Sequence, residues 1–246
     1  MGGFQRMATY MNLLLLERQH FIHEQHVELD QRQLRYVLEV HKACKGDELR
    51  VGVVNGKMGK GIITQLSSKK IQLEVELDTP PPPALPLTVL LAMPRPKMLK
   101  RSLQYLTAMG VKKIVLMNSN RVEKSFWQSP WLSPEKVHEQ LILGLEQARD
   151  TVMPEVILEK RFKPFVEDRL PALMQGRRGL VAHPVGGEIC PHQISVPVVL
   201  AIGPEGGFIG YEVDKLEQAG FWRIHLGPRI LRVETAAIAI VSKLYD

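Results

Sequence analysis

Strand-like and helix-like segments alternate from residue 87 to the end of this 246-residue chain, and the alternation restricts the fold more than any other feature. The expected strands are short apolar runs, and the segments between most of them have the apolar spacing of helices. This alternation is typical of an α/β domain with a mainly parallel sheet covered on both faces, in which ligands bind beyond the carboxyl ends of the strands. We expect strands at 87–92, 113–117, 156–158, 179–182, 196–201 and 222–226, and helices at 97–109, 134–150, 211–219 and 234–245.

Consecutive prolines separate this region from the first part of the chain. Proline runs are extended and semi-rigid, and they cannot continue a helix or a central strand. We therefore place a linker at 80–86, between a first domain at 11–79 and a second domain at 87–246.

The first domain has the pattern of a small β-rich, barrel-like fold. Strand-like runs lie at 49–54, 61–65 and 71–77, and Asn55-Gly56 is a strong hairpin signal between the first two. A helix is expected at 30–40. On a basic protein such a module could bind RNA. A purely structural role for the domain is an equally good interpretation.

The composition is that of a soluble globular protein, with 45% hydrophobic and 24% charged residues. No stretch approaches the length of a membrane-spanning helix, so we expect no membrane partner. Two cysteines are too few for a disulfide framework, which suits the reducing cytoplasm. His20, His23 and His26 have no cysteine or second cluster at a useful spacing, so we expect no metal site.

Basic residues are concentrated in one part of the chain. The net charge is +6, and between residues 87 and 130 the basic residues are accompanied by a single acid, Glu123. This segregation favours a polyanionic partner over an ordinary solvated face, which is the alternative. The candidates for phosphate contacts are Arg95, Lys97, Arg101, Arg121 and Lys124.

Two glycine-containing runs, 202–208 and 226–236, follow predicted strands. A P-loop needs a Lys and a Ser or Thr after its last glycine, whereas Phe208 and Ile209 stand there. A dinucleotide fingerprint needs a different glycine spacing, near the first strand of the domain. Two interpretations remain: a loop whose glycines let the backbone approach a ligand, or a tight turn without a ligand.

The second run places Arg229, Arg232 and Glu234 beside an apolar helix that must be buried. Charges at such a position indicate a functional site. The competing interpretation is that Glu234 favours the positive amino end of the helix and Arg232 pairs with it.

Both runs resemble the signature of the RsmE family, the ribosomal RNA small subunit methyltransferase E enzymes of the SPOUT class. The resemblance extends from about residue 11 to residue 245. The chain departs from the family pattern at 108–110 and at 146–149, and the second departure affects the role of Arg149. The matching residues are Gly203-Pro204-Glu205-Gly206-Gly207-Phe208, then Glu212, then Leu226-Gly227-x-Arg229-Ile230-Leu231-Arg232-x-Glu234-Thr235-Ala236.

The resemblance implies a trefoil-knotted α/β domain, an exception to the rule against knotted chains, after a PUA-like β-barrel domain. It also implies S-adenosylmethionine as cofactor, methylation of N3 of a uridine in 16S rRNA of the small ribosomal subunit, a homodimer, and no DNA partner. The implied cofactor-binding residues are Ala182, His183, Ile202, Gly203, Pro204, Glu205, Gly206, Gly207, Leu226, Gly227, Ile230, Leu231, Arg232 and Thr235.

For the chemistry we expect Arg232 to stabilise the uridine anion and Glu234, or else Glu205, to accept the N3 proton. Arg149 joins the candidates for RNA contacts. Two alternatives stay open: a SPOUT enzyme acting on ribose 2'-OH or another base, and a catalytically silent RNA-binding assembly factor.

Overall fold

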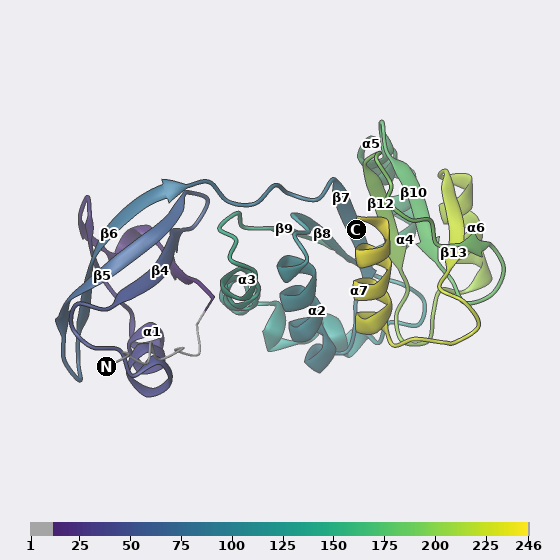
Figure 1. Cartoon of the computed structure of the whole chain (residues 1–246). Helices are drawn as coiled ribbons and strands as arrows, with labels where there is room; N and C mark the ends of the chain where they lie inside the picture. The colour runs from purple at the N-terminus through teal and green to yellow at the C-terminus, as the bar shows by residue number, and fades with distance from the viewer. Residues whose placement is uncertain (1–11, 246) are drawn as a thin grey trace. The chain divides into compact units, whose positions relative to one another are not determined.

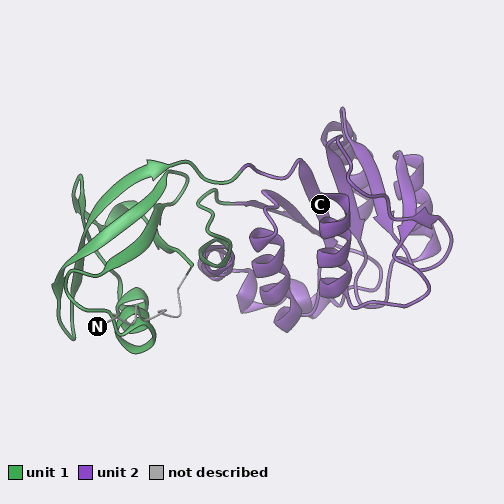
Figure 2. Cartoon of the chain, viewed as in Figure 1, with its two compact units in different colours: residues 1–82, 145–153 green, residues 83–144, 154–246 purple. Residues whose placement is uncertain are grey.

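The computed structural model describes residues 12–245, which form two compact units. Of the described residues, one unit comprises 12–82 with 145–153, and the other comprises 83–144 with 154–245 (Figure 2). Met11, the first residue of the predicted first domain, lies outside the described residues. Within 12–245 no helix is long and apolar enough to cross a membrane.

The first unit is built on a curled six-stranded sheet in the order β1-β4-β5-β6-β3-β2 (Figure 1). The β1 strand pairs with β4 in parallel, and the other neighbours are antiparallel. The α1 helix continues into a π-helical turn, and both contribute apolar side chains to the core. The elements are β1 (Leu14–Leu16), β2 (Phe21–His23), β3 (His26–Glu28), α1 (Gln31–Tyr36), the π turn (Val37–His41), β4 (Glu48–Val53), β5 (Met58–Leu66) and β6 (Ile71–Thr79).

The predicted helix, three strands and hairpin of this unit are confirmed. Asn55 has a φ of 59°, the left-handed conformation that the turn between β4 and β5 requires. The strands β1, β2 and β3 were not expected, because each has only three residues and is defined by its pairing partner more than by an apolar alternation.

Residues 145–153 join the first unit through a buried ion pair. The Arg32 guanidinium donates two hydrogen bonds to Glu146, with Nη1 2.7 Å from Oε2 and Nη2 2.9 Å from Oε1. Glu146 is only 5% exposed, and its Oε1 also accepts a bond from the Leu15 N–H. The Asn55 N–H donates to the Thr151 carbonyl at 2.7 Å. A carboxylate buried this deeply is stable only with such partners, so the role of Glu146 is structural: it holds residues 145–153 to the first unit.

The second unit is built on a seven-stranded sheet in the order β11-β13-β10-β12-β7-β8-β9, in which every neighbouring pair is parallel. The central strands β7 and β12 are buried at every residue, as expected for strands covered on both faces. The strands are β7 (Leu87–Ala92), β8 (Lys113–Met117), β9 (Glu155–Glu159), β10 (Arg178–Ala182), β11 (Glu188–Ile189), β12 (Val198–Ile202) and β13 (Phe221–His225).

Helices connect most of these strands, as predicted. Gly110, with a φ of 86°, follows the end of α2, and Ser133 accepts a hydrogen bond from the Lys136 N–H at the start of α3. The α2 and α7 helices contact each other (Figure 1). The main helices are α2 (Pro96–Ala108), α3 (Pro134–Ala148), α6 (Gly210–Gln218) and α7 (Val233–Leu244). A further helical stretch was not predicted: α4 (Phe162–Pro164), a π turn (Phe165–Arg169) and α5 (Leu170–Met174).

The α/β class with a mainly parallel sheet is therefore confirmed. Five of the six predicted strands overlap those observed almost completely, and the strand expected at 196–201 begins at Val198 instead. Pro197 stands just before it, and proline cannot donate to a sheet ladder.

Asp30 provides a pH-dependent contribution to the stability of the first unit. Its carboxylate accepts a hydrogen bond from the Gln33 N–H at 2.7 Å and lies 3.6 Å from Nε2 of the buried His20. The His20 imidazole lowers the pKa of Asp30 to about 2, helped by the Gln33 N–H and the Arg32 guanidinium and opposed by burial. Because the pKa is lowered, this stabilisation is complete above the ordinary value of 3.8 and is lost as the pH falls toward 2.

Asp30→Asn keeps a helix-capping side chain but removes the charge. We expect it to lower the free energy of unfolding by about 1 kcal/mol at pH 6, a value discounted for solvent screening of this half-exposed group. The deficit should shrink as the pH approaches 3. Urea unfolding at pH 6, 4.5 and 3 measures it, with the exposed Asp78→Asn as control for the lost charge. A deficit that stays constant over this range would contradict the assignment.

Candidate active site

The loops that follow five adjacent strands meet at one edge of the second unit's sheet. The strands lie in the order β13-β10-β12-β7-β8 and run parallel, so their carboxyl ends lie together. Both glycine-containing runs begin at this edge, after β12 and β13. The carboxyl edge is where ligands bind in sheets of this kind.

The first glycine run forms a tight turn, and a different structural constraint explains the glycine at each position. The Gly207 N–H donates to the Pro204 carbonyl at 2.7 Å. A Cβ at Gly203 would lie 2.9 Å from the Phe208 nitrogen, so the turn itself requires glycine there. Gly207 has a φ of 74°, and a Cβ there would meet no atom within 4 Å. The space beside Gly207 is open and lets a ligand approach the backbone.

Two basic residues predicted to contact RNA hold this loop from the neighbouring strand ends. The Arg95 N–H, beyond β7, donates to Glu205 Oε1 at 3.2 Å. The Arg121 guanidinium, beyond β8, donates to the Gly206 carbonyl. A Cβ at Gly206 would lie 2.9 Å from Arg121 Cδ, so this glycine makes room for the arginine.

Glu212 connects the same two segments from inside the protein. It is 2% exposed and lies in the first turn of α6. One oxygen, Oε1, accepts the Asn120 N–H at 2.7 Å. The other, Oε2, accepts the Ser119 hydroxyl at 3.2 Å and the Ile209 N–H at 3.1 Å. The signature residue Glu212 thus holds the turn after β8 against the end of the glycine loop.

The predicted cofactor residues after β10 and β13 lie at the same edge. Ala182 ends β10 and is in register with Ile202 of β12. The His183 N–H donates to the Ile224 carbonyl at 2.9 Å, which fixes the start of its loop. Gly227 donates to His225 Nδ1 at 3.0 Å, has a φ of 109° and, like Gly207, has open space where a Cβ would be. Strand pairing therefore brings together Ala182, His183, Ile202, Gly203 and Leu226.

Arg232 is the N-cap residue of α7, and its side chain is exposed. Glu234 lies in the first turn of this helix, where its charge favours the positive helix end. Within the described residues 12–245, Arg232 and Glu234 form no ion pair with each other, so the structure lacks the pairing that the competing interpretation requires. Ile230, between Gly227 and α7, is 85% exposed.

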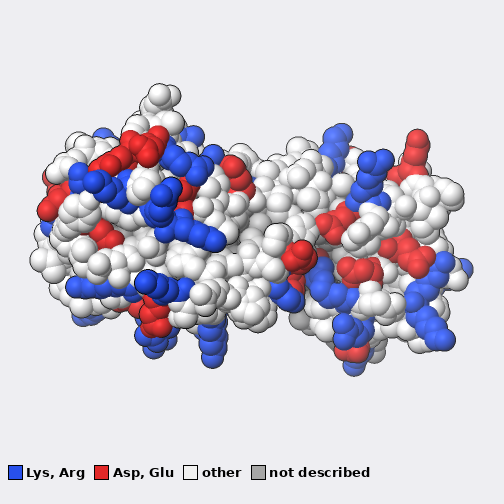
Figure 3. Space-filling view, turned by 180° about the vertical axis from the view of Figure 1, so that it is seen from behind, with Lys and Arg blue, Asp and Glu red and all other residues white. Residues whose placement is uncertain are grey.

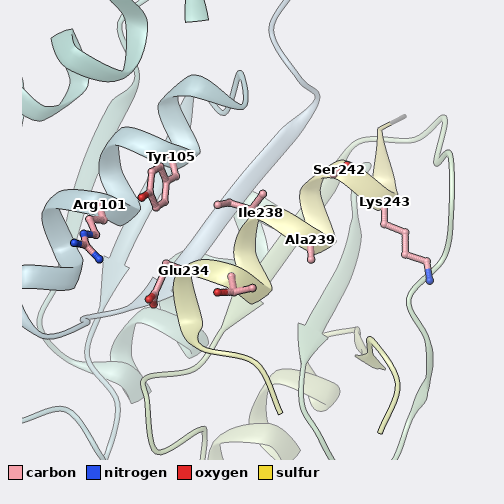
Figure 4. Close-up of a pocket in the computed structure, with 8 residues that line it drawn as sticks. Arg101, Tyr105, Glu234, Ile238, Ala239, Ser242 and Lys243 are labelled. Carbon is pink, nitrogen blue, oxygen red and sulfur yellow. The ribbon is translucent and has the colours of Figure 1, made fainter. Parts of the chain in front are cut away.

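An open groove of about 620 Å³ lies between α2 and α7 beside these residues (Figure 4). Arg101 and Tyr105 line it from α2, and Glu234, Thr235 and Ile238 line it from α7. Thr235, predicted to bind the cofactor, and Arg101, predicted to contact RNA, thus share one groove.

The other predicted RNA contacts are on exposed positions. Lys97 lies in the first turn of α2, and Lys124 begins a 3-10 turn after β8. Arg149 is exposed with a φ of 56° and belongs to the first unit. Figure 3 shows basic and acidic side chains interspersed over one face of each unit, without a continuous basic patch.

Two features of the second unit were missed from the sequence. The buried hydrogen bonds of Glu212 could not be located without knowing which strands are neighbours. Lys100 Nζ lies 3.8 Å from the centre of the Trp131 ring, a cation–π contact that only the approach of α2 to residue 131 reveals. Within residues 12–245, no group of three His, Cys, Asp or Glu could hold a metal ion.

Comparisons with known proteins identify related sequences. A family model described as an RNA methyltransferase domain matches residues 81–245. A protein named ribosomal RNA small subunit methyltransferase E from Treponema pallidum (strain Nichols) is 28% identical over 244 residues, which cover 93% of this chain and 88% of the relative. The protein named ribosomal RNA small subunit methyltransferase E 1 from Borreliella burgdorferi is 25% identical over 229 residues, with coverages of 93% and 95%.

Solved structures share the fold. A methyltransferase from Legionella pneumophila in complex with bound SAM has a TM-score of 0.73 and 24% identity, and covers 94% of this chain and 95% of its own. A ribosomal RNA small subunit methyltransferase E from Neisseria gonorrhoeae bound to S-adenosyl methionine has a TM-score of 0.72 and 22% identity, with the same coverages. The fold and the family model agree, and because the model matches well over half of the sequence, the chain belongs to the RNA methyltransferase family.

Proposed function

We propose that this protein transfers a methyl group from S-adenosylmethionine to N3 of a uridine in 16S rRNA of the small ribosomal subunit. The observation that carries the proposal is the meeting of the two signature glycine runs at one sheet edge, in a domain of the RNA methyltransferase family. The name shared by relatives that align along nearly the whole chain supports the small-subunit substrate.

The loops after β10, β12 and β13 are the proposed cofactor site. Gly207 and Gly227 have left-handed backbones with open space beside them, so a ligand can approach main-chain N–H and carbonyl groups closely. The residues that would hold the cofactor are those predicted from the sequence at 182–183, 202–207, 226–227, 230–232 and 235. The bound cofactor would supply an electrophilic methyl group on its sulfonium.

Arg232 and Glu234 are the proposed catalytic residues. Uracil N3 must lose its proton to become a nucleophile, and the negative charge then spreads to the ring carbonyls. The exposed Arg232 guanidinium can donate a charge-assisted hydrogen bond to such a carbonyl. Glu234 lies two residues further along the chain and lines the α2–α7 groove, and it is the first candidate for proton acceptor. Glu205 is the second, although one of its oxygens already accepts the Arg95 N–H.

The proposal extends to a homodimer and to the trefoil knot implied by the family resemblance. Exposed apolar side chains support the dimer: Tyr105 is 39% exposed on the groove, and Ile230, in the loop before α7, is 85% exposed. Burying such side chains would favour association. Sedimentation equilibrium should give twice the 27.8 kDa chain mass, and a monomer at micromolar concentration would exclude the dimer.

Arg232→Ala should lower methyl transfer to small-subunit RNA by about 10²- to 10³-fold, the usual effect of removing one donor to a developing negative charge. Cofactor affinity, measured by calorimetry, should change only a few-fold. The assay uses labelled S-adenosylmethionine, with mass spectrometry of the product nucleosides to identify the methylated atom. Arg177→Ala, at the opposite edge of the sheet, is the control. Full turnover by Arg232→Ala would refute its role, whereas a methylated ribose or another base would refute the N3 assignment.

RNA binding through phosphates should weaken as salt rises. For single-stranded RNA the slope of log affinity against log salt is about −0.7 per phosphate contact. Replacing both Lys97 and Arg101 by Ala should make the slope shallower by about 1 to 1.5 if each contacts one phosphate. Lys113→Ala with Arg177→Ala, at the amino-terminal edge of the sheet, is the charge-matched control. Wild-type binding that is independent of salt would rule out these contacts.

A further inference from the structure

Glu212 is a buried carboxylate that the proposed chemistry does not use. It is 2% exposed, and no Lys or Arg within the described part of the chain forms an ion pair with it. Burying a carboxylate is costly unless hydrogen bonds replace its water. In Glu212 the hydrogen bonds to water are replaced by bonds from the Ser119 hydroxyl and from the N–H groups of Asn120 and Ile209. The carboxylate also lies at the positive amino end of the α6 helix dipole, which favours its charge.

The three donors come from two different loops. Ile209 directly follows the glycine run 203–208, and its N–H is the kind of group that a first-turn Glu caps in many helices. Ser119 and Asn120 lie beyond β8, more than ninety residues before Glu212 in the chain. Capping of α6 requires only the bond from the Ile209 N–H. The bonds from Ser119 and Asn120 join the segment that follows the glycine loop to the end of the neighbouring strand β8.

The glycine loop depends on the turn that Glu212 holds. The next residue in that turn, Arg121, donates to the Gly206 carbonyl and packs against the Gly206 backbone. A shift of residues 119–121 would therefore move the arginine that supports Gly206. Gly207, the residue with open space for a ligand, is adjacent.

We infer that Glu212 is a positioning residue for the cofactor pocket: its carboxylate aligns the Ser119–Arg121 turn with the glycine loop and thereby sets cofactor affinity. The inference rests on the proposed use of S-adenosylmethionine. Glu212 acts through the loop and does not take part in methyl transfer, so its loss should appear in cofactor binding before it appears in turnover.

A graded set of variants of the full-length protein tests this inference. Ser119→Ala removes one donor. Glu212→Gln keeps an acceptor for the Asn120 N–H but turns an amide donor toward the Ile209 N–H. Glu212→Ala removes all three bonds. On the same helix, Glu217→Gln is the matched control, because Glu217 pairs with Arg223 and has no bond to either loop.

The readout is the dissociation constant of S-adenosylmethionine, measured by calorimetry on folded protein. We expect it to rise about 3-fold for Ser119→Ala, which loses one hydrogen bond, and about 10-fold for Glu212→Gln, which loses one and also sets two donors against each other. Glu212→Ala, which loses all three bonds, should raise it about 100-fold. Glu217→Gln should bind like the wild type. At saturating cofactor, Glu212→Gln should keep kcat within about 3-fold of the wild type, because it lacks only uniform binding.

The outcomes separate this inference from the proposed function. Wild-type protein that does not bind S-adenosylmethionine would overturn both. Wild-type binding with unchanged affinity in Ser119→Ala and Glu212→Gln would overturn the positioning role alone. A lower unfolding temperature without a change in the dissociation constant would do the same, because it would show Glu212 to be only a structural cap.

Discussion

Parallel pairing of five adjacent strands is the constraint on which the rest of the second unit depends. Each parallel neighbour adds its carboxyl end to the same edge, so the loops after β13, β10, β12, β7 and β8 meet although they are far apart in sequence. The fully buried β7 and β12 hold the centre of the sheet. The proposed site lies on loops over a rigid framework, which suits a pocket that must hold a cofactor and admit an RNA base.

At this edge the glycine backbone leaves space for a ligand, and buried polar contacts hold the loop in place. Gly203 and Gly206 are glycines because other parts of the protein occupy the space of their Cβ, whereas Gly207 and Gly227 leave that space open. Glu212 and Arg121 then fix the loop from two sides. Such support allows a pocket to form before its ligand binds. The binding free energy then does not include the entropy cost of ordering the loops.

Much of the fold could be predicted from local pattern, and the failures have physical causes. The runs at β7 and β12 are apolar throughout because both faces are buried, and a sequence shows this directly. Strands of two or three residues, such as β3 and β11, exist only through their partners. The glycine runs and Arg232 could be selected from motif and family resemblance. The partners of Glu212 and Glu146 could not, because they depend on which distant segments become neighbours.

Hydrogen exchange of the full-length protein with and without S-adenosylmethionine tests the central claim most directly, because it reports which backbone segments a ligand orders. The account predicts slower exchange at 182–183, 203–209 and 226–232, together with the 119–121 turn, and little change in the first unit's β4–β5 hairpin. Protection confined to the β11–β13 edge around Trp222, or spread over the first unit alone, would contradict it.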